Sequence, residues 1–172
     1  LHVDAIQSAG KIAVDMRELD ADSLTLSAHK LGGPQGVGAL VLKEGRAGVR
    51  ILHGAGQERG LRAGTENVAG IAGFGVAAEC AMRDLSQASD HAAWRDAAEA
   101  KVVAAGAVII GGAVPRLPNT LFMAVEGWDS PQQLITLDLA GVMVSAGSAC
   151  SSGKVKPSKT MVAMGLDHLA TG

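Results

Sequence analysis

Alternating apolar and polar residues predict three short strands in the first quarter of the chain. They cover "LHVDAIQ" at 1–7, "DSLTLS" at 22–27 and "GALVLKEG" at 38–45, and alternation with a period of two is typical of a half-buried strand. From residue 68 apolar residues recur at steps of three and four, which predicts a helix that ends near residue 85. A second helix is expected near 90–105, followed by the buried-strand pattern "AVIIGG". Such interleaving of strands and helices favours an α/β fold.

Residues with capping preferences indicate where the predicted helices begin and end. Thr65 is suited to be the N-cap of the helix that starts near residue 68. A later helix is predicted in "SPQQLITLDLAG", with Ser130 as N-cap, Gln133 closing a capping box and Gly141 ending the helix. Ser158 is expected to cap a last short helix.

The composition is that of an ordinary globular protein. The chain has 172 residues, 48% of them hydrophobic, and a formal net charge of −2, so neither nucleic acid nor a membrane is indicated as a partner. No apolar run reaches the roughly 18 residues that span a bilayer, and we expect a cytoplasmic location. A domain boundary is expected near residue 88. Leu1 already lies inside a strand pattern and no Met precedes it, which suggests a fragment of a longer protein.

Polar residues follow the first two predicted strands at or just beyond their ends. These residues are Asp4, Gln7, Ser27, His29 and Lys30. In an open α/β sheet the ligand crevice lies at the carboxyl ends of the strands, so one site could contain all of them. A desolvated lysine there can form an imine, and a carboxylate can face the ring nitrogen of a pyridoxal cofactor. Taken singly, Lys30 is equally interpreted as a solvated loop residue and Asp4 as a turn residue at a strand end.

Thr65 is also a candidate for binding phosphate. A hydroxyl N-cap together with the free backbone N–H groups of a helix start forms an anion site. Simple capping is compatible with that role, so the two interpretations of Thr65 stand side by side.

The two cysteines have different surroundings. Two cysteines cannot build a disulfide framework, which favours a reducing compartment. Cys80 lies in the amphipathic helical pattern, where a free cysteine usually behaves as a small buried hydrophobe. Cys150 lies in a loop of small residues that follows the predicted strand "VMVSA". Because Lys154 and Lys156 are close in sequence and favour the thiolate, Cys150 is the candidate reactive cysteine.

Several motifs in succession resemble those of the cysteine desulfurases of the NifS/IscS type. They are "HVDAIQSAGKI", "DSLTLSAHKLGGPQGVGALVL", "GQERGLRAGTENV", "PNTL" and "SAGSACSSGKVKPS". The resemblance implies an α/β fold of the aspartate-aminotransferase kind, fold type I of the transferases that depend on pyridoxal 5′-phosphate. It implies an incomplete large domain, with 1–88 as the C-terminal part of the cofactor-binding large domain. Residues 89–172 correspond to most of the small C-terminal α/β domain, which carries the catalytic cysteine loop.

The same resemblance implies a role for each candidate residue. Lys30 is the Schiff-base lysine, and Cys150 is the nucleophile of a mobile loop. No resident metal is implied, although a transient iron–sulfur contact of Cys150 is possible. The cofactor contacts implied are Asp4 with the pyridine nitrogen, Gln7 with the ring hydroxyl, Ser27 and His29 with the phosphate, and Thr65 with the phosphate of the partner subunit of a homodimer.

The activity implied is the removal of sulfur from L-cysteine. The products are L-alanine and an enzyme persulfide, which passes sulfur to an iron–sulfur scaffold protein or another acceptor. The family's ring-stacking histidine and its arginine for the substrate carboxylate lie outside this chain, so the fragment alone is expected to be inactive. A selenocysteine lyase or an aminotransferase of the same fold is the alternative, and a non-catalytic interaction module is a third hypothesis.

Overall fold

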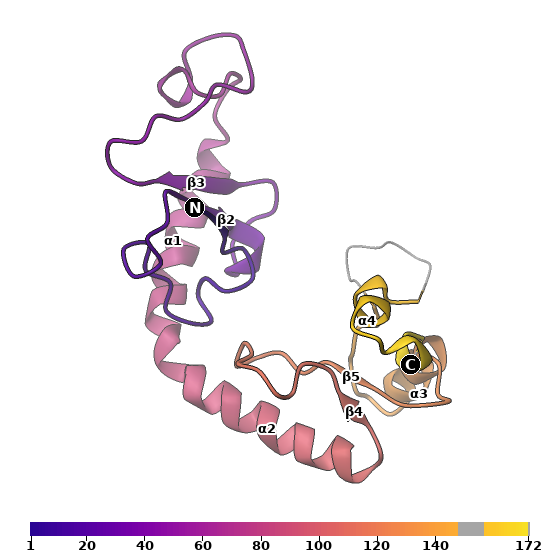
Figure 1. Cartoon of the computed structure of the whole chain (residues 1–172). Coiled ribbons are helices and arrows are strands. Elements are labelled where there is room, and N and C mark those ends of the chain that lie inside the picture. Colours follow the sequence, from indigo (N-terminus) through magenta and orange to yellow (C-terminus); the bar gives the residue numbers. More distant parts are fainter. Residues whose placement is uncertain (148–156, 172) are drawn as a thin grey trace. The chain divides into compact units, whose positions relative to one another are not determined.

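The chain folds into two compact units. The computed structural model describes residues 1–147 and 157–171, and Cys150 therefore lies outside the described residues. The first unit comprises Leu1–Ala92 with Leu117–Asn119, and the second comprises Ala93–Arg116 with Thr120–Gly172 (Figure 1).

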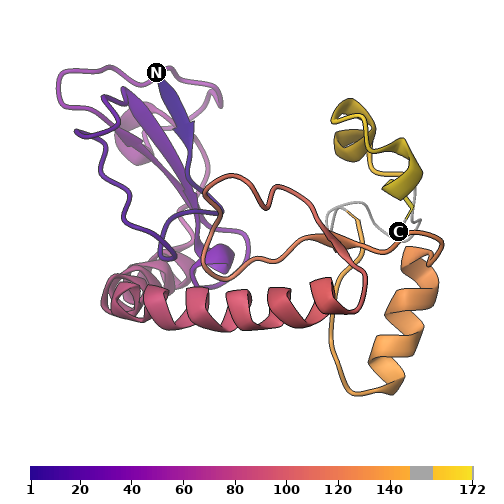
Figure 2. The same ribbon diagram turned by 60° about the horizontal axis from the view of Figure 1, so that its bottom comes forward.

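The first unit is built on a three-stranded sheet with the order β1-β2-β3. Strand β1 is parallel to the central strand β2, and β3 is antiparallel to it. Figure 2 shows these strands side by side. All three strands predicted from the alternating pattern are confirmed, with the bounds His2–Asp4 for β1, Ser23–Ser27 for β2 and Gly38–Leu42 for β3.

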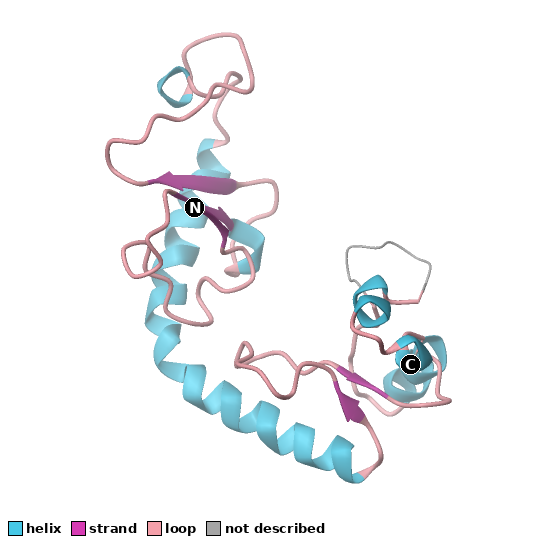
Figure 3. Cartoon of the chain, viewed as in Figure 1, coloured by secondary structure: helices cyan, strands magenta, loops and turns pink. Residues whose placement is uncertain are grey.

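The connection between the two parallel strands consists of turns. Parallel neighbours are usually joined through a helix, whereas residues 5–22 form turns and bridges without one (Figure 3). Ala5 and Ala21, at the two ends of this connection, are fully buried together with Ala28 of the next turn. The connection from β2 to β3 begins with the 3₁₀ turn η1, Ala28–Lys30.

Two helices follow the sheet, and both were predicted, the first of them from the apolar period. After the 3₁₀ turn η2, Glu58–Gly60, they are α1, Val68–Asp84, and α2, Ala88–Ala104, separated by the 3₁₀ turn η3, Leu85–Gln87. Helix α1 buries Phe74, Ala77 and Ala81. Its small residues allow the loops to approach closely, because a Cβ atom on Gly33 would lie 3.0 Å from Cβ of Ala77. A Cβ atom on Gly10 would lie 2.9 Å from Cβ of Ala81.

The start of α1 differs from the prediction. Asn67 is the N-cap, and its side-chain oxygen accepts a hydrogen bond from the backbone N–H of Gly70 at 3.1 Å. Thr65 lies two residues earlier, in an exposed loop. The prediction of Thr65 as N-cap is therefore wrong, because the neighbouring asparagine, which is at least as good a capping residue, takes this position.

The second unit contains a two-stranded antiparallel sheet, β4 and β5, with short helices around it. Its buried apolar cluster combines Ile110 and Ala124 with residues near the C-terminus, namely Met161, Leu169 and Ala170. None of the helices in the described part of the chain is both long and apolar enough to cross a membrane. The elements are β4, Val108–Ile109; β5, Met123–Ala124; α3, Ser130–Leu139; α4, Lys159–Ala163; and the 3₁₀ turn η4, Asp167–Leu169.

The capping box predicted for α3 is absent. The N-cap position is Asp129, and the hydroxyl of Ser130 donates instead to the carbonyl of Thr171 at 2.9 Å. Gln133 is buried, and its side-chain amide donates to the carbonyl of Trp128 at 2.6 Å. Ser130 has thus been taken by a partner distant in sequence and Gln133 by a local carbonyl, so neither side chain forms the box.

Other predictions for the second unit have mixed outcomes. Gly141 has a φ of +77° directly after the C-cap of α3 and ends the helix as predicted. Ser158 caps α4 by accepting from the backbone N–H of Met161 at 3.3 Å. The strand expected in "VMVSA" is wrong, since the described residues 142–147 form no strand.

Candidate active site

The ends of β1 and β2 bring four of the predicted site residues to one edge of the first unit's sheet. The parallel register pairs Asp4 with Thr25. Paired residues on parallel strands, and residues two apart along one strand, have side chains on the same face. Asp4, Thr25 and Ser27 therefore share a face. Ser27 ends β2, and η1 continues directly with His29 and Lys30.

Two donors orient the carboxylate of Asp4. Its oxygen Oδ1 accepts from the backbone N–H of Ile6 at 3.0 Å and from the hydroxyl of Thr25 at 3.4 Å. No described residue donates to the other oxygen, Oδ2, and the side chain is exposed. A carboxylate held through one oxygen can accept a further hydrogen bond from a ligand through the other.

A hydroxyl and an imidazole are paired at the end of β2. Oγ of Ser27 and Nδ1 of His29 lie 2.8 Å apart. In the tautomer in which Nδ1 accepts the hydroxyl proton, Nε2 carries the ring proton and can donate to an anion. The pair is therefore suited to binding a phosphate group. Gln7, in the turn after β1, is exposed, and its side-chain amide has no partner among the described residues.

Lys30 is the last residue of η1 and is half-buried. The turn that carries it is closed by two hydrogen bonds, in which the N–H groups of Leu31 and Gly33 donate to the carbonyl of Ala28 at 2.9 Å each. The ammonium group of Lys11 donates to the carbonyl of Lys30 itself at 3.1 Å. Burial and the positive charge of Lys30 lower the pKa of Lys11 below its usual value of 10.5.

Thr65 is not joined to this group by any hydrogen bond between described residues. It lies in a loop whose backbone carbonyls are held by two arginine side chains. Arg50 donates to the carbonyls of Gly54 and Ala55 at 2.8 Å each, and Arg62 donates to the carbonyl of Gly64 at 2.7 Å. Side-chain contacts thus help to shape the loop that precedes α1, together with the 3₁₀ turn η2.

The reactive cysteine predicted from the sequence, Cys150, lies outside the described residues. Cys80, which was predicted to be a buried hydrophobe, is half-buried on α1. The guanidinium of Arg83, one helical turn further on, donates to Sγ of Cys80 at 3.0 Å. The side chain of Cys80 is therefore less shielded than the helical pattern suggested.

Two contributors to this edge were not among the predicted site residues. Thr25 contacts Asp4, and Lys11 contacts Lys30. A signal for Thr25 was available, because it stands two positions before Ser27 on a predicted strand and so lies on the same face. The contact of Lys11 depends on how residues 5–22 fold back, for which the sequence holds no comparable signal.

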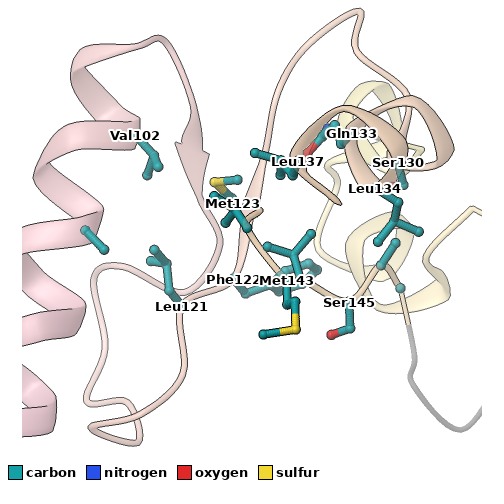
Figure 4. Close-up of a pocket in the computed structure, with 15 residues that line it drawn as sticks. Val102, Leu121, Phe122, Met123, Ser130, Gln133, Leu134, Leu137, Met143 and Ser145 are labelled. Atoms are coloured by element: carbon teal, nitrogen blue, oxygen red, sulfur yellow. The ribbon is translucent and has the colours of Figure 1, made fainter. Parts of the chain in front are cut away.

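A separate hollow of about 480 Å³ lies in the second unit. Figure 4 shows Leu121, Phe122 and Met143 around it, with Leu134 and Leu137 of α3. None of the described residues that line it carries an ionisable side chain. Among the described residues the lining of this hollow is therefore apolar apart from Ser130, Gln133 and Ser145, in contrast to the polar edge of the first unit.

Comparison with known proteins places the chain in a family. The model of the aminotransferase class-V family matches residues 1–170. The cysteine desulfurase NifS of Azotobacter vinelandii is 41% identical over 172 residues, covering 98% of this chain and 43% of that protein. The cysteine desulfurase of Rhodobacter capsulatus is 43% identical over 171 residues, covering 98% of this chain and 44% of that protein.

A solved structure of a NifS-like protein gives the same result for the fold. It superposes with a TM-score of 0.84 at 36% identity, covering 99% of this chain and 44% of its own. The chain thus spans less than half the length of these relatives. The predicted α/β fold is confirmed, and the chain belongs to the aminotransferase class-V family.

Proposed function

We propose that the protein is a cysteine desulfurase that depends on pyridoxal 5′-phosphate. The observation that carries the proposal is the group of Asp4, Ser27, His29 and Lys30 at the carboxyl ends of two parallel strands. Curated relatives that match nearly the whole chain are named cysteine desulfurases, and because the chain spans only part of their length, the activity of the whole protein is an inference.

The donor set fits this cofactor. Three features of the site suit three groups of the cofactor. A half-buried lysine suits the aldehyde, a carboxylate with one oxygen available suits the protonated ring nitrogen, and a hydroxyl–imidazole pair suits the phosphate. Lys30 would hold the aldehyde carbon, Asp4 the ring nitrogen, and Ser27 and His29 the phosphate. Gln7 would contact the ring hydroxyl, and Thr65 the phosphate in the partner subunit. When bound, the cofactor supplies a ring that stores the electron pair released from the substrate.

Each residue then has a task toward the substrate cysteine. The amine of Lys30, once released by the substrate, moves the α-proton of the cysteine. Asp4 keeps the ring nitrogen protonated, because a carboxylate stabilises the positive charge that lies against it.

We assign the sulfur transfer to Cys150 on sequence grounds. Its thiolate attacks the sulfur of the substrate, forming an S–S bond while the bond between sulfur and Cβ breaks. The electron pair of the broken bond remains with the carbon side, which is protonated to alanine, and the sulfur stays on Cys150 as a persulfide. An iron–sulfur scaffold or another acceptor protein then takes the sulfur.

We further infer a homodimer in which the loop carrying Thr65 reaches the partner subunit. This is supported by the exposed apolar side chains before that loop, with Val49 83% and Ile51 82% exposed. Residues 1–88 are proposed as the C-terminal part of the cofactor-binding domain and 89–172 as the small domain. A cytoplasmic location remains part of the proposal, on the sequence grounds given above.

The decisive experiment is to incubate the full-length protein with cofactor and L-cysteine and to measure alanine, sulfide and protein-bound sulfur. We expect the alanine to equal the sum of sulfide and protein-bound sulfur, and none of these products from Lys30→Ala. An aminotransferase would form a keto acid instead of sulfide, and a selenocysteine lyase would act on selenocysteine but not on cysteine. A protein that binds no cofactor and forms no alanine would contradict the proposal and favour an interaction module.

A further inference from the structure

We propose that Thr25 is a positioning residue that acts through Asp4. Its hydroxyl fixes Oδ1 of the Asp4 carboxylate and so leaves Oδ2 for the ring nitrogen of the cofactor. This inference rests on the proposed function, because it assumes that the group at the strand ends holds a pyridoxal ring.

The backbone holds the two residues rigidly next to each other. Asp4 and Thr25 are partners in the parallel register of β1 and β2. The N–H of Ala5, next to Asp4, donates to the carbonyl of Thr25 at 3.1 Å. On its other side Thr25 pairs with Leu40 of β3. Thr25 lies in the central strand, hydrogen-bonded to the β1 side and flanked by β3, which makes it a firm support for a neighbouring side chain.

The contact meets a specific need of Asp4. The side chain of Asp4 is exposed, and the terminal torsion of an aspartate is broad and can turn unless it is held. Ile6 and Thr25 donate to the same oxygen, Oδ1, from two directions, at 3.0 and 3.4 Å. Two donors on one oxygen select one orientation of the carboxylate and thereby define where Oδ2 lies.

The longer distance makes the bond from Thr25 the weaker of the two. Removing it is therefore expected to reduce the function of Asp4 and not to abolish it. A bond of this kind contributes a factor of about three to ten in an equilibrium or a rate.

The chain offers closely matched substitutions at this position. Thr25→Val keeps the shape and the β-branch that suit a strand and removes only the hydroxyl. Thr25→Ser keeps the hydroxyl and loses a methyl group. The affinity of the full-length protein for pyridoxal 5′-phosphate, titrated by absorbance without any substrate, reports on the site independently of desulfurase activity. Circular dichroism of each variant verifies that the fold is retained.

We expect Thr25→Val to weaken cofactor affinity and to lower turnover by about threefold to tenfold, and Thr25→Ser to stay within about twofold of wild type. The same substitutions are then made in an Asp4→Ala background. There Thr25→Val should cause no further loss, since the residue through which it acts is gone.

Two results would overturn the inference. One is wild-type affinity and turnover in Thr25→Val, and the other is an equal loss with and without Asp4, which would mean a merely structural hydroxyl. If the protein binds the cofactor and shows the coupling but does not release sulfur from cysteine, the inference holds and the proposed reaction fails. If cofactor affinity is absent altogether, both fail.

Discussion

The ammonium group of Lys11 donates to the backbone carbonyl of Lys30 at 3.1 Å, across the turns that follow β1. Both lysines are half-buried. The contact ties the turn that carries the proposed cofactor lysine to the connection between the two parallel strands. It also keeps a second positive charge in the neighbourhood of Lys30.

This relationship predicts a pH dependence of stability. The pKa of Lys11 is lowered from 10.5 by burial and by the charge of Lys30. Just below pH 10.5 the unfolded chain therefore binds more protons at this position than the folded protein does, and the free energy of unfolding rises with pH through that window. Lys11→Met removes this rise.

Urea titrations at neutral pH and just below pH 10.5 give the free energy of unfolding of wild type and of Lys11→Met. The prediction is tested by comparing how much this free energy changes with pH in the two proteins. Lys43→Met is the matched control, because the pKa of Lys43 is raised by its hydrogen bond with Asp20. An identical pH slope for wild type and Lys11→Met would contradict the prediction.

The close approach of η1 to α1 predicts that Gly33→Ala is destabilising. The added Cβ atom would lie 3.0 Å from Cβ of Ala77 and 3.1 Å from the carbonyl oxygen of Ala28. Relieving this overlap should cost about 1 to 3 kcal/mol and shift the turn that carries Lys30. The expected result is a lower unfolding free energy together with weaker cofactor binding.

Gly75→Ala is the control for that experiment. Gly75 lies on α1 with nothing within 4 Å of the position of a Cβ atom. Alanine should therefore stabilise the helix there by up to about 1 kcal/mol. If both alanine variants changed stability alike, the close contact at Gly33 would not be the cause.

The observed start of α1 separates the roles of Asn67 and Thr65. Asn67→Ala removes the N-cap bond to Gly70 and should lower the free energy of unfolding by about 1 kcal/mol. Thr65 lies outside the helix in an exposed loop. Thr65→Ala should therefore change the free energy of unfolding by less than about 0.5 kcal/mol. Its expected effect is on the affinity of the proposed homodimer for the cofactor. A loss of stability in Thr65→Ala as large as that in Asn67→Ala would restore Thr65 as the capping residue.

The two cysteines are expected to differ in sulfur transfer. Cys150→Ser should still bind cofactor and cysteine, because Lys30 and Asp4 remain, but should release little or no sulfide. Cys80→Ser should retain desulfurase activity, since Cys80 lies on α1 against Arg83. Alkylation after reaction with cysteine, followed by peptide mass analysis, locates the added sulfur. Its appearance on the Cys80 peptide would contradict the assignment.

Some features follow from local patterns that hold in any context. The strands at His2–Asp4, Ser23–Ser27 and Gly38–Leu42 and the helix at Val68–Asp84 were predictable, because alternation and the helical period are patterns within a short stretch of chain. Gly141 was predictable as the end of α3, since a positive φ favours glycine over all other residues.

The choice between residues of similar local preference was not predictable. Thr65 and Asn67 are both good capping residues, and only the position of the first helical turn decided for Asn67. Ser130 and Gln133 satisfy the capping-box pattern, yet Thr171 and Trp128 provide them with other partners. Thr171 is distant in sequence, so its competing hydrogen bond has no local signal.

The sequence by itself thus determined the order of the elements and the polar residues at the ends of the first two strands, because both are encoded in short segments. Only the tertiary structure decided which of these residues meet. The register that sets Thr25 beside Asp4 and the folding back of Lys11 onto the carbonyl of Lys30 each join segments about 20 residues apart. Such contacts depend on how the turns close and how α1 packs against them, and no periodicity along the chain records that closure.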